Sequence, residues 1–296
     1  MKIVISGGSG FIGKYLTSFF EERGDQVFEL VREKKDGKIY WDPGKKEIEK
    51  EKLENMDLFI CLNGVNITKK RWSERFKQKI LHSRADSVSF LSKTIRSLKN
   101  PPKLFIQSSG AGFYGDTPTK VDENGSKGSL FLSEVCDLWE KASNDLPEET
   151  RCVSLRLGMV LGESGGALKK MLPLFKKGLG LIMGDGKTMI SWIRVEDVGF
   201  AIEHIISSKM LSGPINLVSP QVVTSKTFYQ TLAKTYGRSC FLFFPKLLIN
   251  LVFGQMGREL FLANANIYPK KLLDSGFHFR YTELKLAFIG EKKDEV

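Results

Sequence analysis

The stretch "IVISGGSGFIGKYLTSFFEERG", Ile3 to Gly24, decides the fold because it joins an apolar strand to an amphipathic helix through a glycine-rich turn. Glycine permits a tight turn and a close approach of the backbone, and the first turn of a helix offers unpaired N–H groups to a pyrophosphate. A strand, this turn, a helix and a second strand follow one another in the right order, which predicts a dinucleotide site. Its expected contacts are Gly7, Gly10, Phe11, Ile12 and Gly13.

Outward from this stretch, short apolar runs alternate with helical patterns, which indicates parallel strands joined by crossover helices. The expected strands are Lys2–Ser6, Gln26–Val31, Asp57–Leu62, Lys103–Ser108 and Arg151–Leu157. The expected helices are Phe11–Arg23, Arg71–Leu98 and Leu130–Leu146. We therefore expect an α/β protein with a Rossmann-type, doubly wound parallel sheet.

The pattern loosens after about Gly158 into helix, loop and short strand pieces, which predicts a smaller mixed C-terminal lobe. The expected domains are residues 1–157, to which segment 191–218 returns, and residues 158–296. The charged, turn-rich segment Trp41–Asn55 predicts a surface hairpin and linker. The apolar segment Phe241–Gly254 is too short to span a bilayer, which takes about 20 residues. A buried or partner-facing helix is favoured there over a membrane-surface helix.

The composition limits which binding partners and which cellular compartment are expected. The 296 residues include 45 Lys and Arg against 34 Asp and Glu, and a formal charge of +11 suits anionic partners. The basic segment Lys69–Lys79 reads as an amphipathic helix, so no nucleic acid is expected. Four scattered cysteines predict reduced thiols, and three isolated histidines give no sign of a metal site. The N-terminus reads as a strand rather than a signal peptide, so we expect a cytoplasmic protein.

The end of the second expected strand bears on the choice of cofactor. An NAD site places Asp or Glu there to accept from the ribose 2′-hydroxyl, whereas Arg meets a 2′-phosphate. Here Val31 and Arg32 end the strand, and Lys34 and Lys35 follow. This predicts NADP(H), with Arg32 as the main contact. Glu29 keeps NAD open as the alternative, although it lies several residues too early.

The GxxGxxG spacing makes the chain resemble the extended short-chain dehydrogenase/reductase superfamily. Further segments are similar to its atypical "epimerase family" subgroup, in that family's order and over nearly the whole chain. They are "YWDPGK", "LNGVNITKKRW", "HSR", "SSGAGFYGD", "FLSEVCDLWE", "SLRLGMVLGESGGALKKMLPLF", "SWIRVEDVGFAI", "GPINLVSPQVVTSKTF" and "YPKKLLDSGFHFRY".

The resemblance implies further cofactor contacts. Leu62, Asn63 and Gly64 follow the strand beneath the adenine ribose, where the family usually has "LAG", so Asn63 is a departure that backbone contacts would tolerate. Arg71 either reaches a cofactor phosphate or stays in solvent. The other implied contacts are Ser108, at the end of the fourth strand, and Met159 and Val160, in the loop that approaches the nicotinamide.

In working superfamily members a Ser polarises the substrate, a Tyr transfers the proton, and a Lys one helical turn later lowers the Tyr pKa. The stretch "SSGAGFYGD" supplies Ser109 and Tyr114, but the expected helix "FLSEVCDLWEKAS", Phe131 to Ser143, has no Tyr and therefore no Tyr-x-x-x-Lys pair. Two registers are open for it. Either Val135 and Trp139 take those two positions and the proton relay is lost, or Cys136 and Glu140 do and a thiol and a carboxylate remain.

Two functions follow from these residues. The first is an NADP(H)-dependent oxidoreductase or epimerase-like enzyme acting on an unidentified small molecule, with Ser109, Tyr114, Glu140 and Cys136 as candidate catalytic residues. The second is a non-catalytic NADP(H) sensor or scaffold whose C-terminal lobe docks a protein partner. By analogy with the superfamily, a homodimer is possible.

Overall fold

The computed structural model describes residues 1–290, which fall into two compact units. Unit 1 comprises Met1–Gly110, Glu134–Leu155 and Ile205–Ile215, and unit 2 comprises Ala111–Ser133, Arg156–His204 and the chain from Asn216 onward. Each unit has an apolar core of its own. Compactness alone does not establish independent folding, so the predicted domain boundary at residue 157 stays a prediction.

Unit 1 is built on an eight-stranded sheet with the order β13-β8-β6-β5-β1-β2-β3-β4. Around β1 the neighbours β5 and β2 are both parallel, as are β5 with β6 and β2 with β3, which confirms the predicted Rossmann-type sheet. The last residues of β8 and β13 belong to unit 2. The strands are β1 Lys2–Ser6, β2 Gln26–Val31, β3 Ile39–Asp42, β4 Glu47–Ile48, β5 Leu58–Cys61, β6 Leu104–Gly110, β8 Arg151–Leu157 and β13 Gly213–Leu217.

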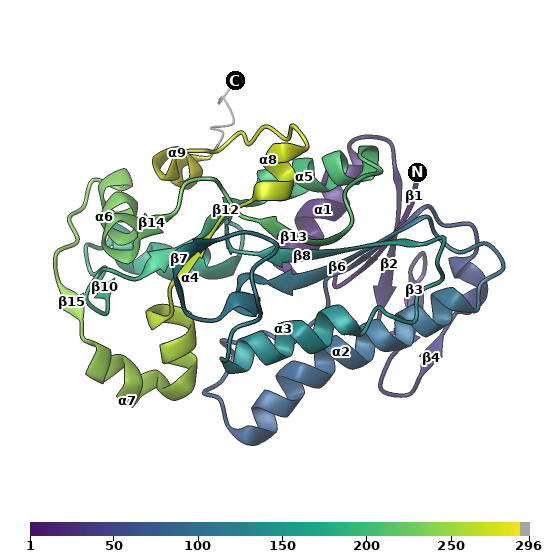
Figure 1. Cartoon of the computed structure of the whole chain (residues 1–296), viewed down its shortest axis with the longest axis horizontal. Coiled ribbons are helices and arrows are strands. Elements are labelled where there is room, and N and C mark those ends of the chain that lie inside the picture. The colour runs from purple at the N-terminus through teal and green to yellow at the C-terminus, as the bar shows by residue number, and fades with distance from the viewer. Residues whose placement is uncertain (291–296) are drawn as a thin grey trace. The chain divides into compact units, whose positions relative to one another are not determined.

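Helices cover both faces of this sheet, which is why its central strands are apolar throughout. Figure 1 shows α2 (Glu74–Arg96) and α3 (Phe131–Lys141) on one side of the sheet and α1 (Phe11–Glu21) on the other. The core beneath α2 and α3 joins side chains from the sheet and from both helices. It includes Val4, Phe59, Phe105, Val88, Leu91, Ile95 and Trp139. In a parallel sheet of this kind ligands bind at the carboxyl ends of the strands, and the candidate site is found there.

The segment after β2 differs from its prediction. Residues 39–48 do form a hairpin, since β3 pairs antiparallel with β4, but β3 also extends the main sheet by pairing with β2. Trp41 and Leu53, the latter in the 3₁₀ turn η1 (Lys50–Leu53), are almost completely buried. The hairpin is therefore a packed edge of the sheet and not a surface linker, because its apolar residues complete the core beside Leu30.

Unit 2 is a mixed unit whose short strands pair two by two: β9 with β12, β16 with β7, β11 with β14 and β10 with β15. Its core gathers around Trp192, Phe228 and Phe288. The elements are η2 Ala111–Tyr114, β7 Thr117–Val121, β9 Met159–Leu161, α4 Gly166–Lys176, β10 Ile182–Met183, β11 Met189–Ile190, β12 Trp192–Arg194, α5 Val195–Ser207, β14 Val223–Thr224, α6 Ser225–Thr235, β15 Phe243–Phe244, α7 Lys246–Gly257, η3 Arg258–Leu262, β16 Ala265–Ile267, α8 Lys270–Asp274 and α9 Leu284–Ile289.

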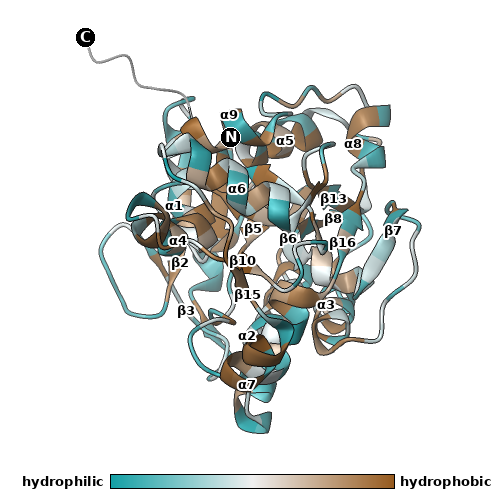
Figure 2. Cartoon of the chain, turned by 90° about the vertical axis from the view of Figure 1, so that its left-hand side faces the viewer, coloured by the Kyte–Doolittle hydropathy of each residue, from teal (hydrophilic) through white to brown (hydrophobic). Residues whose placement is uncertain are grey.

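Helix α7 is not buried within unit 2. Leu247 and Leu251 are 77% and 70% exposed, and Phe241 ahead of the helix is 70% exposed. Figure 2 shows α7 as a largely brown, apolar helix, of which Ile249, Gly254, Met256 and Gly257 are buried. The expectation of a buried helix is therefore wrong, whereas the partner-facing helix, favoured over a membrane-surface helix, stays a prediction. Among the helices of residues 1–290, none combines the length and hydropathy needed to cross a membrane.

Candidate functional site

The glycine-rich loop after β1 has the geometry that its sequence predicts. Gly7 has a φ of +79°, a conformation that favours glycine, and a Cβ on Gly13 would lie 2.2 Å from the Gly7 carbonyl oxygen. The Gly10 N–H closes the turn on that oxygen at 3.0 Å. Gly10 caps α1 with no side chain of its own, so the first turn, with Phe11 and Ile12, presents backbone N–H groups to an anion.

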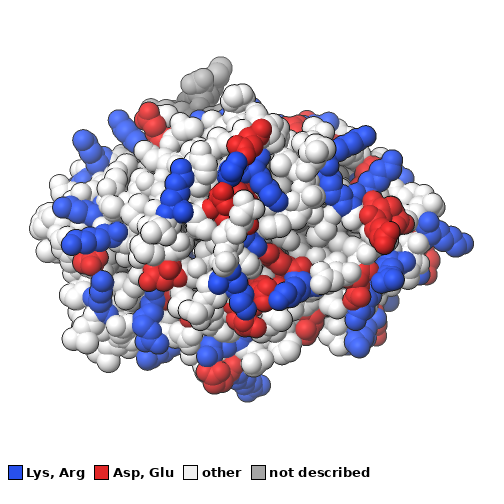
Figure 3. All heavy atoms as spheres, viewed as in Figure 1, with Lys and Arg blue, Asp and Glu red and all other residues white. Residues whose placement is uncertain are grey.

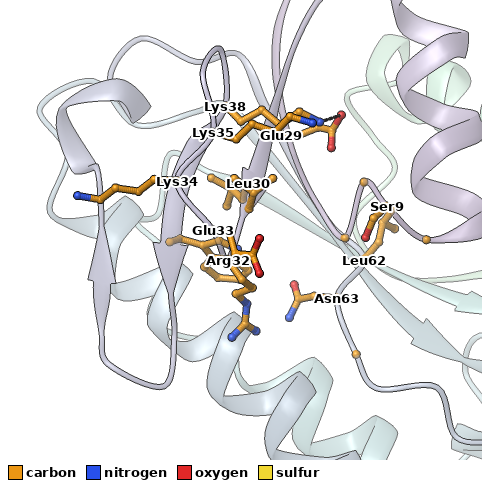
Figure 4. A pocket seen from close by; sticks show the side chains of 16 residues that line it. Ser9, Glu29, Leu30, Arg32, Glu33, Lys34, Lys35, Lys38, Leu62 and Asn63 are labelled. Carbon is orange, nitrogen blue, oxygen red and sulfur yellow. Dashed lines mark ion pairs between the residues drawn. The ribbon is translucent and has the colours of Figure 1, made fainter. Parts of the chain in front are cut away.

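A cavity of about 640 Å³ opens beside this loop. Its walls come from the loop, from the end of β2 with the residues that follow, and from the segment after β5 (Figure 4). The lining residues include Gly7, Gly10, Val31, Arg32, Leu62, Asn63 and Gly64, which the sequence predicted as cofactor contacts. Phe11, Ile12, Gly13, Arg71, Ser108, Met159 and Val160 are not among them.

Basic side chains line the β2 end of this cavity. Arg32 is half-exposed, lies over the Trp41 ring and is 3.7 Å from the Asp42 carboxylate. In Figure 4 its guanidinium lies on the side of Asn63, whereas the Lys34 ammonium points away from the cavity. An exposed guanidinium with only a distant carboxylate can accept a phosphate at little cost in lost contacts.

Glu29, which kept NAD open, is engaged in the structure. Its carboxylate forms a 2.7 Å ion pair with Lys38, drawn as a dashed line in Figure 4. It also lies against Gly8, where a Cβ would come within 2.8 Å of a carboxylate oxygen. The cavity wall at Glu29 is therefore close to neutral.

Asn63, the departure from the family pattern, uses its side chain to hold the loop. Its Oδ1 accepts from the Ser6 hydroxyl at 2.7 Å, and its Nδ2 donates to the Ser83 carbonyl at 3.3 Å. The Ser83 hydroxyl in turn accepts from the Val65 N–H at 3.1 Å. This loop wall is therefore tied both to β1 and to α2, which leaves the backbone of Leu62 to Gly64 facing the cavity.

Helix α3 presents Cys136 and Glu140 toward the end of β6. The Ser109 hydroxyl donates to Glu140 Oε1 at 2.6 Å. Val135 and Trp139 are buried as Cys136 is, but Trp139 packs in the core against α2. The structure therefore has a carboxylate and a thiol, one helical turn apart, beside Ser109; that these are the positions where the superfamily carries Lys and Tyr stays a prediction.

The side chain of Gln107 fixes this helix on the sheet. Its Nε2 donates to the Glu140 carbonyl at 3.1 Å, to the Ser143 hydroxyl at 3.0 Å and to the Ser154 hydroxyl at 2.9 Å. Because Gln107 lies on β6 two residues before Ser109, these hydrogen bonds fix the position of α3 along β6 relative to the Ser109 hydroxyl.

The Cys136 thiol is an inert neighbour of this pair. Burial, followed by the nearby charge of Glu140, raises the pKa of Cys136 to about 11. A thiol is nucleophilic only as thiolate, so at neutral pH Cys136 carries a proton that it releases with difficulty. Ser109 and Glu140 are the two groups of the cluster that can exchange a proton with a ligand.

Tyr114 belongs to unit 2, where its hydroxyl is already engaged. It donates to Asn216 Oδ1 at 2.7 Å and accepts from Arg156 at 2.9 Å, and all three side chains are buried. Burial raises the pKa of Tyr114. The Asn216 N–H donates to the buried Glu123 carboxylate at 3.0 Å, which closes the network. Sequence analysis missed this network, because its members lie in four separate segments.

The other predicted residues are dispersed. Arg71 is exposed ahead of α2, and Ser108 is buried near the end of β6. Met159 and Val160 lie in β9 of unit 2, paired with Trp192 and Ile193 of β12. Within residues 1–290 no three His, Cys, Asp or Glu side chains are grouped as metal ligands. On the face in Figure 3, Lys and Arg alternate with Asp and Glu and do not form one basic stripe.

Comparison with known proteins identifies related chains. A model of the "NAD dependent epimerase/dehydratase family" matches residues 3–217, and a "Domain of unknown function (DUF1731)" matches residues 244–288. The chain is 32% identical over 291 residues to the human epimerase family protein SDR39U1, covering 97% of this chain and 98% of that protein. It is 34% identical over 286 residues to the epimerase family protein Mb2239 of Mycobacterium bovis, covering 95% and 94%.

Solved structures extend these similarities. The crystal structure of human SDR39U1 (isoform 2) with NADPH has a TM-score of 0.89 and 30% identity, over 97% of this chain and 98% of that chain. A UDP-N-acetylglucosamine 4-epimerase from Bacillus cereus has a TM-score of 0.76 at 15% identity, which is a likeness of fold alone.

Proposed function

Because the chain belongs to the NAD dependent epimerase/dehydratase family, we propose that it binds NADP(H) in the cavity of Figure 4 and catalyses oxidation and reduction, or epimerisation, of a small molecule. One observation carries this proposal: the uncapped N-terminus of α1 and the exposed Arg32 guanidinium lie at the same cavity. The first suits a pyrophosphate, and the second suits a 2′-phosphate.

The charges along the cavity favour NADP(H) over NAD(H). Glu29 is neutralised by Lys38, so it neither repels a phosphate nor is free to accept from a ribose hydroxyl. Among residues 1–290, Asp42 at 3.7 Å is the one carboxylate that competes for Arg32. The NADPH bound to human SDR39U1, a protein similar to this chain over nearly its whole length, supports the same choice.

The Ser109–Glu140 pair supports a role in proton transfer. The bound nicotinamide would supply the hydride acceptor or donor. The Ser109 hydroxyl already donates to Glu140, so its oxygen can accept the proton of a substrate hydroxyl while its own proton passes to the carboxylate. The pair gains one proton in all, because the substrate proton moves to the Ser109 oxygen and the Ser109 proton moves to the Glu140 carboxylate. The reverse sequence protonates a substrate carbonyl during reduction.

Calorimetric titration of the full chain with NADPH and NADH tests the binding step. We expect NADPH to bind more tightly, and Arg32→Ala to weaken NADPH binding about 10- to 100-fold while leaving NADH nearly unchanged, as for the loss of a charge-assisted hydrogen bond. Arg96→Ala removes an exposed Arg outside the cavity and serves as the matched control. Equal binding of both nucleotides, unchanged by Arg32→Ala, would overturn the assignment of NADP(H).

Turnover is tested separately by following NADPH oxidation with carbonyl compounds and nucleotide sugars. Enzymatic function predicts hydride transfer with at least one substrate class. The second candidate, a non-catalytic NADP(H) sensor that docks a protein partner, is favoured by the lack of a Tyr-x-x-x-Lys pair in α3 and by the exposed apolar residues of α7. Tight NADPH binding without turnover on any substrate would select it. A cytoplasmic location and a homodimer stay predictions.

A further inference from the structure

Arg84, on α2, is a half-buried cation without an acidic partner. Its guanidinium donates to the carbonyls of Ile80 at 2.9 Å and Val65 at 3.1 Å, lies 3.5 Å from the Ser83 hydroxyl, and stacks over the Trp139 ring at 5.1 Å. In the part of the chain that the structure describes, no carboxylate pairs with it. Two carbonyls and an aromatic face therefore fix its orientation without neutralising its charge.

Such an arrangement is unfavourable unless something else uses the charge. Removing a cation from water costs free energy that a carboxylate usually offsets, as Glu196 does for the buried Arg194 at 2.6 Å. For Arg84 the cost is visible in its pKa, which burial lowers to about 10. Groups held in this state recur at binding sites, where the ligand supplies the missing charge.

The guanidinium also has a donor to spare. Arginine carries five N–H groups, and the hydrogen bonds of Arg84 to residues 1–290 all involve its two terminal nitrogens. Its Nε–H has no hydrogen-bond acceptor within residues 1–290. The Nε atom is not completely buried, so it keeps some contact with solvent. A Cβ on Gly64 would lie 3.1 Å from Nε and 2.8 Å from Cζ, so the guanidinium lies directly behind the Gly64 wall of the cavity.

Arg84 is also a neighbour of the candidate catalytic cluster. The positive charge of Arg84 acts on the Cys136 thiol, where it opposes the rise in pKa that burial causes. Cys136 lies one helical turn from Glu140. Arg84 therefore lies between the Gly64 wall of the cofactor cavity and α3, close to where Glu140 of α3 meets Ser109 of β6.

We infer that Arg84 binds an anionic group of the ligand, a carboxylate or a phosphate, at the α3 end of the cavity. This inference rests on the proposed function and narrows it. The anion is either a phosphate of the dinucleotide or an acidic group of the substrate, and in the second case the substrate class is an organic acid or a phosphate ester. The guanidinium geometry matches both chemically, because it offers planar, charge-assisted hydrogen bonds.

Two titrations of the full chain test the inference and separate the two sources. NADPH is titrated first, and inorganic phosphate and malonate are then titrated into the NADPH-saturated protein. If the anion belongs to the dinucleotide, Arg84→Gln weakens NADPH binding at least tenfold. If it belongs to the substrate, NADPH binding is unchanged, and phosphate or malonate binds the wild-type complex at least tenfold more tightly than the Arg84→Gln complex.

Arg84→Lys keeps the charge and is expected to retain part of whichever affinity is lost, which also covers the case in which Arg84→Gln does not fold. Arg151→Gln is the matched control, since Arg151 likewise donates to two carbonyls, those of Leu211 and Ile205, away from the cavity. If NADPH binds wild type and Arg84→Gln alike and neither anion distinguishes them, Arg84 only holds the loop and the inference is wrong. Failure of wild type to bind NADPH at all would instead overturn the proposed function.

Discussion

Two short hydrogen bonds in this protein have similar lengths and opposite surroundings. Ser109 donates to Glu140 at 2.6 Å in unit 1, and Tyr114 donates to Asn216 at 2.7 Å in unit 2. Glu140 is half-buried, so its carboxylate can exchange a proton with a ligand. Tyr114 and Asn216 lie among further buried polar groups, so we expect their bond to maintain the fold. Two residues five positions apart in one predicted motif thus have different surroundings: Ser109 belongs to the proposed proton-transfer pair, and Tyr114 to a buried network.

Glu140→Gln should have the largest effect and should act on turnover alone. The amide keeps the shape of the side chain but cannot accept the Ser109 proton, so we expect turnover to fall about 10²- to 10⁴-fold. Stability should change by no more than about 1 kcal/mol, as is usual for an isosteric change outside the core. Steady-state rates of NADPH oxidation and urea unfolding measure the two quantities. Full turnover in Glu140→Gln would remove this carboxylate from the reaction.

Asn216→Ala should have the largest effect on stability. It leaves the Tyr114 hydroxyl and the Tyr268 carbonyl, to which Asn216 Nδ2 donates at 3.0 Å, without their buried partner. At about 1–2 kcal/mol for each bond, the free energy of unfolding should fall by about 2–4 kcal/mol. Asn124→Ala, at an exposed position of the same unit, is the control. If Asn124→Ala lowered the free energy of unfolding as much as Asn216→Ala does, the buried hydrogen bonds of Asn216 would contribute no measurable stability.

Tyr114→Phe sharpens the comparison, because it removes only the hydroxyl. We expect a loss of about 1–2 kcal/mol in urea unfolding, from one donor and one acceptor interaction. The turnover of the folded enzyme should stay within about twofold of wild type, whereas Ser109→Ala should lower it strongly. If Tyr114→Phe reduced turnover as much as Ser109→Ala, the hydroxyl would have to reach the substrate and the comparison would fail.

The smallest expected effect is a pH dependence from Glu123. Burial raises the pKa of this carboxyl above its ordinary value of 4.5, despite the hydrogen bonds from the N–H groups of Asn216 and Lys271. The folded state therefore holds the proton more tightly than the unfolded state. That contribution to stability is present below pH 4.5 and is lost as the pH rises through the raised pKa. The free energy of unfolding of wild type relative to Glu123→Gln, measured in urea across this range, should fall as the pH rises; a rise would contradict the assignment.

Local patterns were enough to predict most of unit 1. The bounds of β1, β2 and β8 agree with the sequence prediction, since each strand carries a short, mainly apolar run that ends at turn residues. The glycine loop, Arg32 and the segment Leu62–Gly64 were also predicted and line one cavity. The family, too, was readable from motifs spread along the chain.

Contacts between distant segments were beyond the reach of these patterns. The buried hairpin edge at Trp41 depends on core space that other strands leave open. The ion pair of Glu29 with Lys38 and the carbonyl contacts of Arg84 depend on the packing of separate loops and helices. The segment "HSR" was noted as a family motif, but nothing in its letters indicates that its Arg has no acidic partner.

The sequence by itself determined the doubly wound sheet, the dinucleotide loop and the absence of a Tyr-x-x-x-Lys pair from α3, because each of these depends on residues that are neighbours along the chain. Only the tertiary structure decided that Cys136 and Glu140 face Ser109 while Val135 and Trp139 enter the core. A helix with apolar residues on more than one side fits either register, and the choice is made by the apolar surface of α2 and by the hydrogen bonds of Gln107. Those partners lie about 30 to 50 residues away from α3 in sequence, and they meet it only in the folded chain.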